Sequence, residues 1–360
     1  MTAEHFSVEE RVENFKRFYE RKNERPLLGF YVGSEYPLAR HPGFHYLPEG
    51  RPLTPEDFDI DVLLKDTDAL YETHEKFGGD FLYAGTAFWG IPWVEASLGC
   101  PVYANHSTGS IYCEPPADFE DASDIPEFDP ENPWMKLMAR MYDALCEHSA
   151  GRYPIGTTRF RGISDLLSAL YGGDELVFGM IDDPEDMEEA CRKLTDYWIS
   201  AARLQLAHIT EFKGGIGSFY YYMWAPRNTV WYQEDTVALL SPALYKQFIE
   251  PCVRRIVSEL GNVIIHEHPV GFLPYQSYAD AGMTAMELHI DEGGPSAEQL
   301  YDIHRYIMDR KPLLIWGDFK EEDFDWLIQK LPPQGLALLP VVRTQEEADA
   351  RWTKLRAIYK

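Results

Sequence analysis

The segment from Leu240 to His268 constrains the fold more than any other part of the chain, because it predicts a helix followed by a buried strand. Ser241 is suited to cap the helix, and Pro242 is suited to its first turn, where a missing N–H costs nothing. Gly261 predicts the end of the helix. The apolar run Val263–Ile265 then predicts a strand that is covered on both faces, as in the parallel sheets of α/β proteins.

Short apolar segments alternate with amphipathic segments along the rest of the chain. The eight candidate strands are Leu27–Val32, Phe81–Phe88, Ile155–Phe160, Gly215–Tyr221, Val263–His268, Thr284–Ile290, Leu313–Asp318 and Leu336–Val342. The clearest amphipathic segments are Asp183–Leu206, Pro242–Leu260, Ser296–Met308 and Thr344–Ile358. This alternation predicts a parallel sheet, and eight units in one chain of 360 residues predict a single-domain (β/α)8 barrel.

A doubly wound sheet is the alternative fold, but no Gly-x-Gly-x-x-Gly follows the first strand. Two irregular segments, Ser34–Asp59 and Trp89–Pro133, predict long loops after the first and second strands. Long ordered loops on a compact domain are usually lids or interfaces.

The composition limits the classes of function. With 59 acidic and 33 basic residues the net charge is −26, which argues against nucleic-acid binding. No apolar run approaches the length of a membrane span, and the N-terminus lacks the apolar core of a signal peptide. The five cysteines are scattered without a Cys-x-x-Cys pair, which predicts free thiols and a cytoplasmic protein.

His266 and His268 form the sharpest candidate site. Alternate side chains of a strand point to the same face, so both imidazoles are expected to face the barrel interior, with Glu267 pointing toward the surrounding helices. Two imidazoles at a strand end are half of a zinc site, and Glu287 or His289 on the next strand could complete it. The alternative is that these histidines only form hydrogen bonds inside a polar barrel mouth.

The same helix and strand resemble those of a known family. The pattern Ser-Pro-x-x-Tyr-x-x-Phe-x-x-Pro-x-x-x-x-Ile, before a strand ending in His, resembles the uroporphyrinogen decarboxylase superfamily, which includes methyltransferases that act with corrinoid proteins. Here it is formed by Ser241, Pro242, Tyr245, Phe248, Pro251 and Ile256. Glu95–Cys100 and Gly317–Phe319 agree with this resemblance, as does the chain length. It implies a (β/α)8 barrel with its site at the carboxyl ends of the strands.

The methyltransferases of that superfamily hold zinc with a His-x-Cys at this strand end and a further Cys near the last strand. The zinc binds a thiol and makes it a thiolate nucleophile toward a methyl group. In this chain His268 stands where the first Cys would be, and Leu336–Arg343 contains no Cys. The resemblance therefore implies a site of two histidines and a carboxylate instead of a thiolate-rich one.

The decarboxylases of the superfamily grip substrate carboxylates with two arginines after the first strand. Leu27–Glu35 contains neither, and Arg40 is the nearest arginine. Thr86 or Ala87 stands where the family has an Asp, and the family's Tyr falls near Leu170, beside Tyr171. A substrate with eight carboxylates could hardly be held without these groups, which argues against uroporphyrinogen itself.

Other candidate site residues follow from the predicted strand ends, which a barrel brings to one mouth. The candidates for substrate binding are Tyr31, Glu35, Thr86, Arg159, Tyr222, Trp224 and Arg343. Asp318 is a candidate catalytic acid or base beside His266 and His268, or alternatively the N-cap of the helix that begins near Glu321.

No cobalamin-carrying signature of the form Asp-x-His-x-x-Gly is complete. Asp302 and His304 begin one, but Ile307 replaces the Gly. A corrinoid would therefore have to arrive on a separate partner protein. A small-molecule substrate is expected, and a homodimer is the candidate assembly.

Three hypotheses for function remain open at this point. The first is a methyltransferase-like enzyme that moves a methyl group between a small substrate and a corrinoid protein, with zinc as the candidate cofactor. The second is a lyase that decarboxylates an acid smaller than uroporphyrinogen. The third is a ligand-binding barrel without catalysis.

Overall fold

The computed structural model describes residues 2–34, 36–218 and 220–359. Its strands are β1 (Leu27–Leu28), β2 (Tyr31–Val32), β3 (Val102–Asn105), β4 (Ser110–Cys113), β5 (Gly156–Thr157), β6 (Gly215–Ser218), β7 (Met223–Pro226), β8 (Val230–Gln233), β9 (Val263–Glu267), β10 (Ala285–Ile290), β11 (Leu313–Gly317) and β12 (Leu336–Val342).

The α-helices are α1 (Val8–Tyr19), α2 (Pro37–Arg40), α3 (Ile60–Phe77), α4 (Trp93–Ser97), α5 (Pro133–Ser149), α6 (Ile163–Tyr171), α7 (Gly173–Asp182), α8 (Pro184–Ala207), α9 (Pro242–Leu244), α10 (Glu250–Leu260), α11 (Tyr275–Ala281), α12 (Tyr301–Met308), α13 (Glu321–Lys330) and α14 (Gln345–Ile358). A π-helical turn, Tyr245–Ile249, joins α9 to α10.

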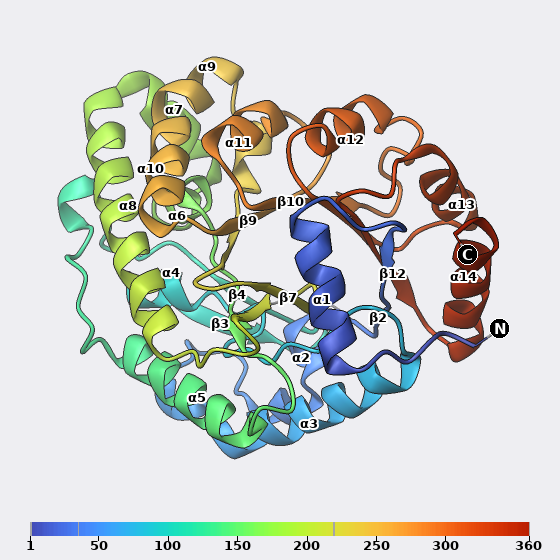
Figure 1. Cartoon of the computed structure of the whole chain (residues 1–360). Coiled ribbons are helices and arrows are strands. Elements are labelled where there is room, and N and C mark those ends of the chain that lie inside the picture. The colour runs from blue at the N-terminus through green and yellow to red at the C-terminus, as the bar shows by residue number, and fades with distance from the viewer. Residues whose placement is uncertain (1, 35, 219, 360) are drawn as a thin grey trace.

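The centre of the fold is a parallel sheet of seven strands. Its order is β1-β12-β11-β10-β9-β8, and β2 also pairs with β12. Helices surround the strands on the outside, and α1 lies across one end of the sheet (Figure 1). This arrangement is a barrel-like α/β fold with a parallel central sheet, as the alternation of strands and helices predicts.

The central strands β9, β10 and β11 are covered on both faces, and they are largely apolar except for the polar residues near the carboxyl ends of β9 and β10. Every residue of β9, β10 and β11 is buried, and the apolar members of these strands belong to one continuous core. Burial on both faces explains why these segments lack the polar alternation of a half-exposed strand.

The predicted helix–strand unit is confirmed, with one local difference. The Ser241 hydroxyl accepts a hydrogen bond from the Leu244 N–H at 3.3 Å, and Pro242 is the first helical residue. Gly261 follows the last residue of α10 with a φ of 80°. The helix is interrupted by the π-helical turn before Pro251, which cannot donate a backbone hydrogen bond in the expected ladder.

Two predicted strands differ from the structure. Phe81–Phe88 contains no extended ladder, only an isolated bridge between Gly85 and Ile155. Gly215–Tyr221 was expected as the strand before β9 in the barrel, but the strand that pairs with β9 is β8. The segment that was predicted instead forms β6, which pairs with β5 and turns back into the antiparallel β7.

The long segment Trp89–Pro133 is not entirely irregular, because it contains the antiparallel hairpin of β3 and β4. The short helix α2, from the other long segment, contacts this hairpin through the Leu38 N–H, which donates to the Gly109 carbonyl at 2.9 Å. The two long segments therefore meet each other on the surface of the barrel-like core.

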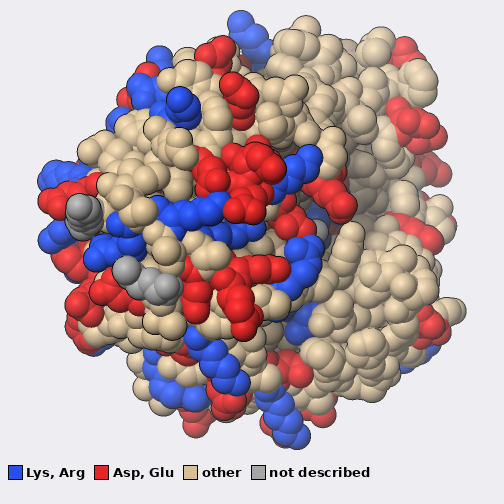
Figure 2. Space-filling view, turned by 90° about the vertical axis from the view of Figure 1, so that its right-hand side faces the viewer, with Lys and Arg blue, Asp and Glu red and all other residues tan. Residues whose placement is uncertain are grey.

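On the face that carries α13 and α14, basic and acidic side chains are interspersed (Figure 2). Lys354 pairs with Glu321 at 2.5 Å and with Asp325 at 2.8 Å, for example. Among the described residues, no helix has both the length and the apolar content needed to cross a bilayer.

Candidate metal centre

The register of three neighbouring strands brings polar side chains together at their carboxyl ends. Gln233 of β8 lies opposite His266 of β9, and His266 lies opposite Glu287 of β10. On the other side of β10, His289 lies opposite Trp316 of β11. Residues that are opposite each other in adjacent strands point to the same face, so these side chains converge.

Each of the two predicted histidines is held by its own carboxylate. His266 Nδ1 forms a short contact with Glu287 Oε2, and His268 Nδ1 lies 2.7 Å from Asp291 Oδ1. The Nε2 atoms of the two rings face each other at 2.9 Å. His266 and His268 therefore turn their remaining ring nitrogens toward one common point.

His289 belongs to the same cluster. Its Nδ1 lies 3.6 Å from Glu287 Oε1, and its Nε2 lies 4.0 Å from Asp291 Oδ1. Neither His289 Nδ1, Glu287 Oε1 nor Asp291 Oδ2 has a hydrogen-bond partner among the described residues, although all three atoms are buried. Buried polar atoms without partners are rare and mark a place where a cation or water fits.

Burial and charge set the protonation states of the cluster. Burial, with the nearby charge of His268, lowers the pKa of His266 to about 3, so this ring is neutral. For His268 burial acts in the same direction, but Asp291 and Asp235 outweigh it and raise its pKa to about 9. Burial also raises the pKa of Glu287. The cluster thus combines a neutral imidazole donor with carboxylates that favour positive charge nearby.

A cavity of about 230 Å³ opens beside the two histidines. Its floor and walls include His266, His268, Asp235, Arg159 and Trp316. Pro37 of α2 and Ser110 and Ile111 of the β3–β4 hairpin line the same cavity, so both long segments contribute to its wall.

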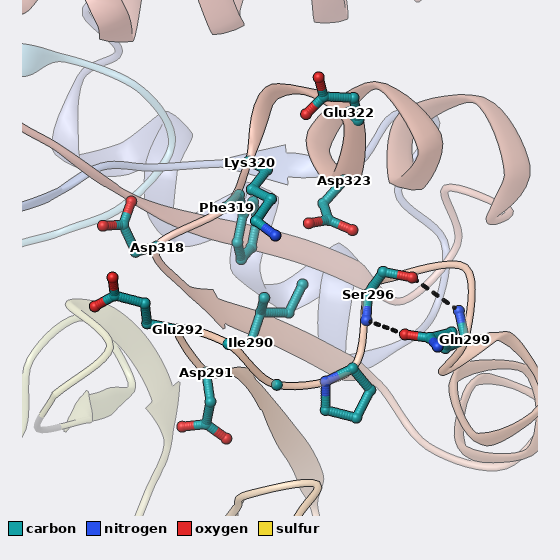
Figure 3. Close-up of a pocket in the computed structure, with 13 residues that line it drawn as sticks. Ile290, Asp291, Glu292, Ser296, Gln299, Asp318, Phe319, Lys320, Glu322 and Asp323 are labelled. Carbon is teal, nitrogen blue, oxygen red and sulfur yellow. Dashed lines mark hydrogen bonds between the residues drawn. The ribbon is translucent and has the colours of Figure 1, made fainter.

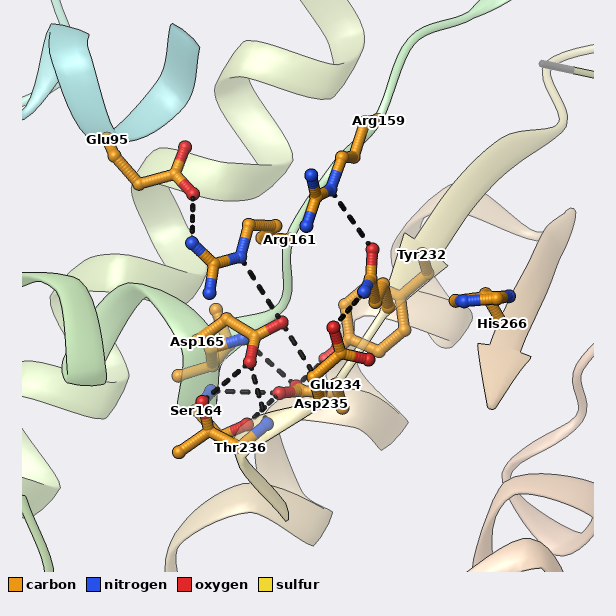
Figure 4. A network of polar contacts seen from close by, with 12 residues as sticks. Glu95, Arg159, Arg161, Ser164, Asp165, Tyr232, Glu234, Asp235, Thr236 and His266 are labelled. Carbon is orange, nitrogen blue, oxygen red and sulfur yellow. Dashed lines mark hydrogen bonds and ion pairs between the residues drawn. The ribbon is translucent and has the colours of Figure 1, made fainter. Parts of the chain in front are cut away.

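Asp235 is held in place by a network that ties the end of β8 to the start of α6. The Asp165 carboxylate accepts from the Asp235 N–H at 3.2 Å and from the Thr236 N–H at 2.8 Å. Next to it, the Glu234 carboxylate accepts from the N–H groups of Ile163 and Ser164, each at 2.9 Å. Figure 4 shows these contacts converging between β8 and α6.

Three overlapping sets of ligand atoms are close enough to hold a metal ion. They are Asp235, His266 and His268; His266, Glu287 and His289; and His268, His289 and Asp291. Within each set, the ligand atoms all lie within 4.8 Å of one another. Imidazole and carboxylate are ligands that Zn²⁺ accepts.

The structure brings some of the predicted site residues together. The histidines, Glu287 and His289 form one cluster, and Arg159 lines the same cavity, where its Nε donates to Gln233 Oε1 at 3.2 Å. Tyr31 does not line this cavity, but its ring centroid lies 5.1 Å from that of Trp316, which does.

Other predicted residues lie away from the cluster. Thr86 is buried and hydrogen-bonds to Tyr142 at 3.2 Å, and Tyr222 stacks on Tyr31 and Tyr83 in the core. Trp224 packs against Tyr19 of α1 at the opposite end of the sheet. Glu35 lies outside the described residues.

Asp318 and Arg343 form an exposed ion pair with each other at 2.6 Å. Asp318 does not cap α13, whose N-cap is Lys320. It lines a neighbouring cavity of about 540 Å³ that also contains Asp291 and Glu292 (Figure 3). Asp318 therefore faces the second cavity, which adjoins the histidine cluster through Asp291.

Arg40, the arginine nearest to the first strand, does not line the histidine cavity described above. Its guanidinium lies over the rings of Tyr31, Trp89 and Tyr222, at 4.6, 5.0 and 5.3 Å from their centroids. It therefore attaches α2 to the aromatic core.

Asp235 and Asp291 were not predicted as site residues. Asp291 directly follows β10, and Asp235 follows the apolar run Val230–Tyr232, so both stand in the position that marks a strand-end site. Asp235 was missed because β8 was not recognised as a strand.

No protein-family model matches the sequence, and no curated protein is similar to it in sequence. Among solved structures, the fold is similar to that of a methyltransferase from Methanosarcina mazei, with a TM-score of 0.65. The similarity covers 97% of this chain and 99% of that chain, at 13% sequence identity. The fold of this chain is therefore that of the methyltransferase.

Proposed function

We propose that the protein is a methyltransferase-like enzyme of the uroporphyrinogen decarboxylase superfamily that binds zinc at the end of β9. The observation that carries this proposal is the pair of facing Nε2 atoms in His266 and His268, each ring being backed by a carboxylate. Ligand histidines in metal sites almost always donate their other ring nitrogen to such a group. The similarity in fold to a methyltransferase supports the same reading.

Asp235, His266 and His268 are the ligand set that we favour. Glu287 and Asp291 already contact the Nδ1 atoms of the histidines, which suits them to orient the rings. Asp235 has no such role, and it lines the open cavity with both histidines. Three protein ligands facing a cavity leave a coordination position for substrate, as in catalytic zinc sites.

Zinc held by these residues would favour the thiolate form of a substrate thiol, and a thiolate is the stronger nucleophile toward a methyl group. The chain's own residues bind and orient the substrate. Arg159 is a cation that suits an anionic group of the substrate, and Trp316 supplies an apolar wall. The methyl donor is proposed to be a corrinoid on a separate protein, which would approach the cavity under α2 and the β3–β4 hairpin.

We also propose that the whole chain is one domain and that its strands close into a (β/α)8 barrel. Two isolated bridges support this closure beyond the seven-stranded sheet. One joins Arg161, after β5, to Gln233 of β8, and the other joins Gly85 to Ile155.

Metal analysis of tag-free protein, purified without chelators, tests the centre. We expect about one zinc per chain, and its loss in His266→Ala. Asp235→Asn should weaken binding by more than Glu287→Gln, because only Asp235 is proposed as a ligand. The reverse order would identify Glu287 as the ligand. Absence of metal from the unmodified protein, even after incubation with zinc, would refute the centre.

Methyl transfer is tested separately with methylcobalamin and a panel of small thiols, followed by the absorbance of the demethylated corrinoid. We expect turnover by the zinc-loaded protein and its loss in His268→Ala. If the zinc-loaded protein transfers no methyl group to any thiol, even with added corrinoid protein, the methyltransferase proposal is refuted while the metal centre stands.

A further inference from the structure

Two cysteines that are far apart in sequence meet between α8 and α10, on the outside of the barrel-like core. Cys191 lies in α8 and Cys252 in α10, and the two helices pack against each other. The Cys252 thiol donates to the carbonyl of Cys191 at 3.9 Å and to that of Phe248 at 3.1 Å, so the two cysteines are direct neighbours. This pair is distinct from the histidine cluster, and it is not a Cys-x-x-Cys motif that sequence spacing would reveal.

The two thiols line a surface cavity of about 410 Å³. Both residues are largely buried, with 4% and 6% of their surface exposed, so each contributes only its edge to the cavity. The cavity is otherwise lined by Glu188, Arg192, Thr195, Gln247, Phe248, Pro251 and Arg255. The pair therefore lies directly beneath a surface cavity.

The two thiols are not equivalent. The neighbouring Cys191 thiol lowers the pKa of Cys252, and Thr195 and the charge of Arg255 act in the same direction against the effect of burial. The neighbouring Cys252 thiol and burial together raise the pKa of Cys191 well above its usual range. Cys252 is thus the group that reaches the thiolate form first, and the thiolate is the nucleophile in disulfide exchange.

We propose that Cys191 and Cys252 form a reversible dithiol–disulfide site whose oxidant is a small, uncharged disulfide. The Cys252 thiolate attacks one sulfur of the disulfide RSSR, which forms a mixed disulfide and releases RS⁻. Cys191 then attacks the Cys252 sulfur, forms the Cys191–Cys252 bond and releases the second RS⁻. The protons of the two cysteines end on these leaving groups, so that one RSSR and two thiols give one internal disulfide and two RSH.

The charges around the cavity favour an uncharged oxidant. Arg192 pairs with Glu189 at 2.5 Å and with Asp196 at 3.1 Å, and Arg255 pairs with Asp196 at 2.5 Å. The arginines are therefore neutralised by surface acids, in a protein whose net charge is −26. Bis(2-hydroxyethyl) disulfide should accordingly react faster than the anionic glutathione disulfide.

The test treats the reduced, folded, full-length protein with bis(2-hydroxyethyl) disulfide, then blocks free thiols under denaturing conditions and maps the peptides by mass spectrometry. We expect a linked peptide pair that contains Cys191 and Cys252 and has lost two hydrogens. In Cys191→Ser the mixed disulfide should persist on Cys252, because the resolving thiol is absent. In Cys252→Ser the reaction at Cys191 should slow by at least about tenfold.

Cys146→Ser is the matched control, because Cys146 contacts the His208 carbonyl and lies outside the pair. It should form the Cys191–Cys252 bond at the unmodified rate. The proposal is overturned if Cys191 and Cys252 are both recovered as free thiols, or if they become linked only after the far-ultraviolet circular dichroism signal of the folded protein is lost.

Discussion

At the residue scale, the position of each acid along its strand decides its role near the histidines. Glu287 is aligned with His266 across β9 and β10, and it points to the same face. Glu267, one residue away from His266, points to the other face, where its two carboxylate oxygens lack hydrogen-bond partners among the described residues and burial raises its pKa. Glu287 and Glu267 are both buried acids, but they occupy neighbouring positions in the register of β9 and β10 and therefore point to opposite faces of the sheet.

Asp291→Asn tests the orienting role of the carboxylate behind His268. The amide keeps the shape of the side chain but loses the charge that favours the His268 Nδ1–H. We expect zinc affinity to fall by about 10- to 100-fold, as for other groups behind a ligand histidine. Competition with a chromophoric chelator measures this.

Glu292→Gln is the control, because it removes an acid from the neighbouring cavity without touching a histidine. Equal zinc affinity of Asp291→Asn and the unmodified protein would show that Asp291 does not support a ligand.

Sequence reasoning identified four of the six residues of the cluster, namely His266, His268, Glu287 and His289, and missed Asp235 and Asp291. Strand geometry alone predicts that His266 and His268 point to the same face of the sheet. It also predicts that Glu287 of the next strand points toward them. Asp235 could not be found in this way because β8 spans only Val230–Gln233 and follows a hairpin with a stronger strand pattern. The pairing of Asp291 with His268 depends on loop conformation, which periodicity does not encode.

At the element scale, the connection between β8 and α6 fixes one wall of the site. The Glu234 carboxylate accepts hydrogen bonds from the first N–H groups of α6, which have no partners inside the helix. Burial raises the pKa of Glu234 to about 8, and Asp165 adds to this effect. The acid therefore acts as a buried cap for a helix that is distant in sequence.

Glu234→Ala should destabilise the protein, because it leaves buried N–H groups of Ile163 and Ser164 without acceptors. The expected cost is about 1–3 kcal/mol for each unsatisfied group. Urea denaturation measures the free energy of unfolding. Glu234→Gln keeps an acceptor oxygen and should lose less. If both variants are as stable as the unmodified protein, Glu234 does not secure α6.

The elements that were predicted well are those that packing fixes on both sides. The strand β12 spans the predicted Leu336–Val342, and α14 lies within one residue of its predicted start. Phe81–Phe88 failed as a strand although it is equally apolar. Its side chains are buried, but Phe88 adopts a positive φ of 43° and the segment's β-bridge to a neighbouring segment is limited to Gly85. Burial and strand pairing are separate properties, and hydrophobicity reports only the first.

At the scale of the whole molecule, stability depends on pH through histidines that are buried as neutral rings. Burial lowers the pKa of His41 and His304 to about 3 and that of His74 to about 4. The unfolded chain, with histidine pKa values near 6.5, binds more protons than the folded chain below that pH. Stability is therefore fully present above about pH 6.5 and is lost as the pH falls toward the folded pKa values.

His304 is the best residue for measuring how one buried neutral histidine makes stability depend on pH. It is fully buried in α12, and neither ring nitrogen has a hydrogen-bond partner among the described residues. Between pH 7 and pH 5, a histidine with these two pKa values destabilises the folded state by about 2 kcal/mol. His304→Leu removes this titration and also removes two unsatisfied polar atoms from the core.

We therefore expect His304→Leu to lose about 2 kcal/mol less stability than the unmodified protein between pH 7 and pH 5. Urea denaturation at the two pH values measures the difference. Comparing the two proteins cancels the effect of acid on the net charge of −26, which is common to both. His5→Leu, which removes an exposed imidazole, should leave the pH dependence unchanged. Parallel stability curves for His304→Leu and the unmodified protein would mean that His304 is protonated as easily in the folded as in the unfolded chain.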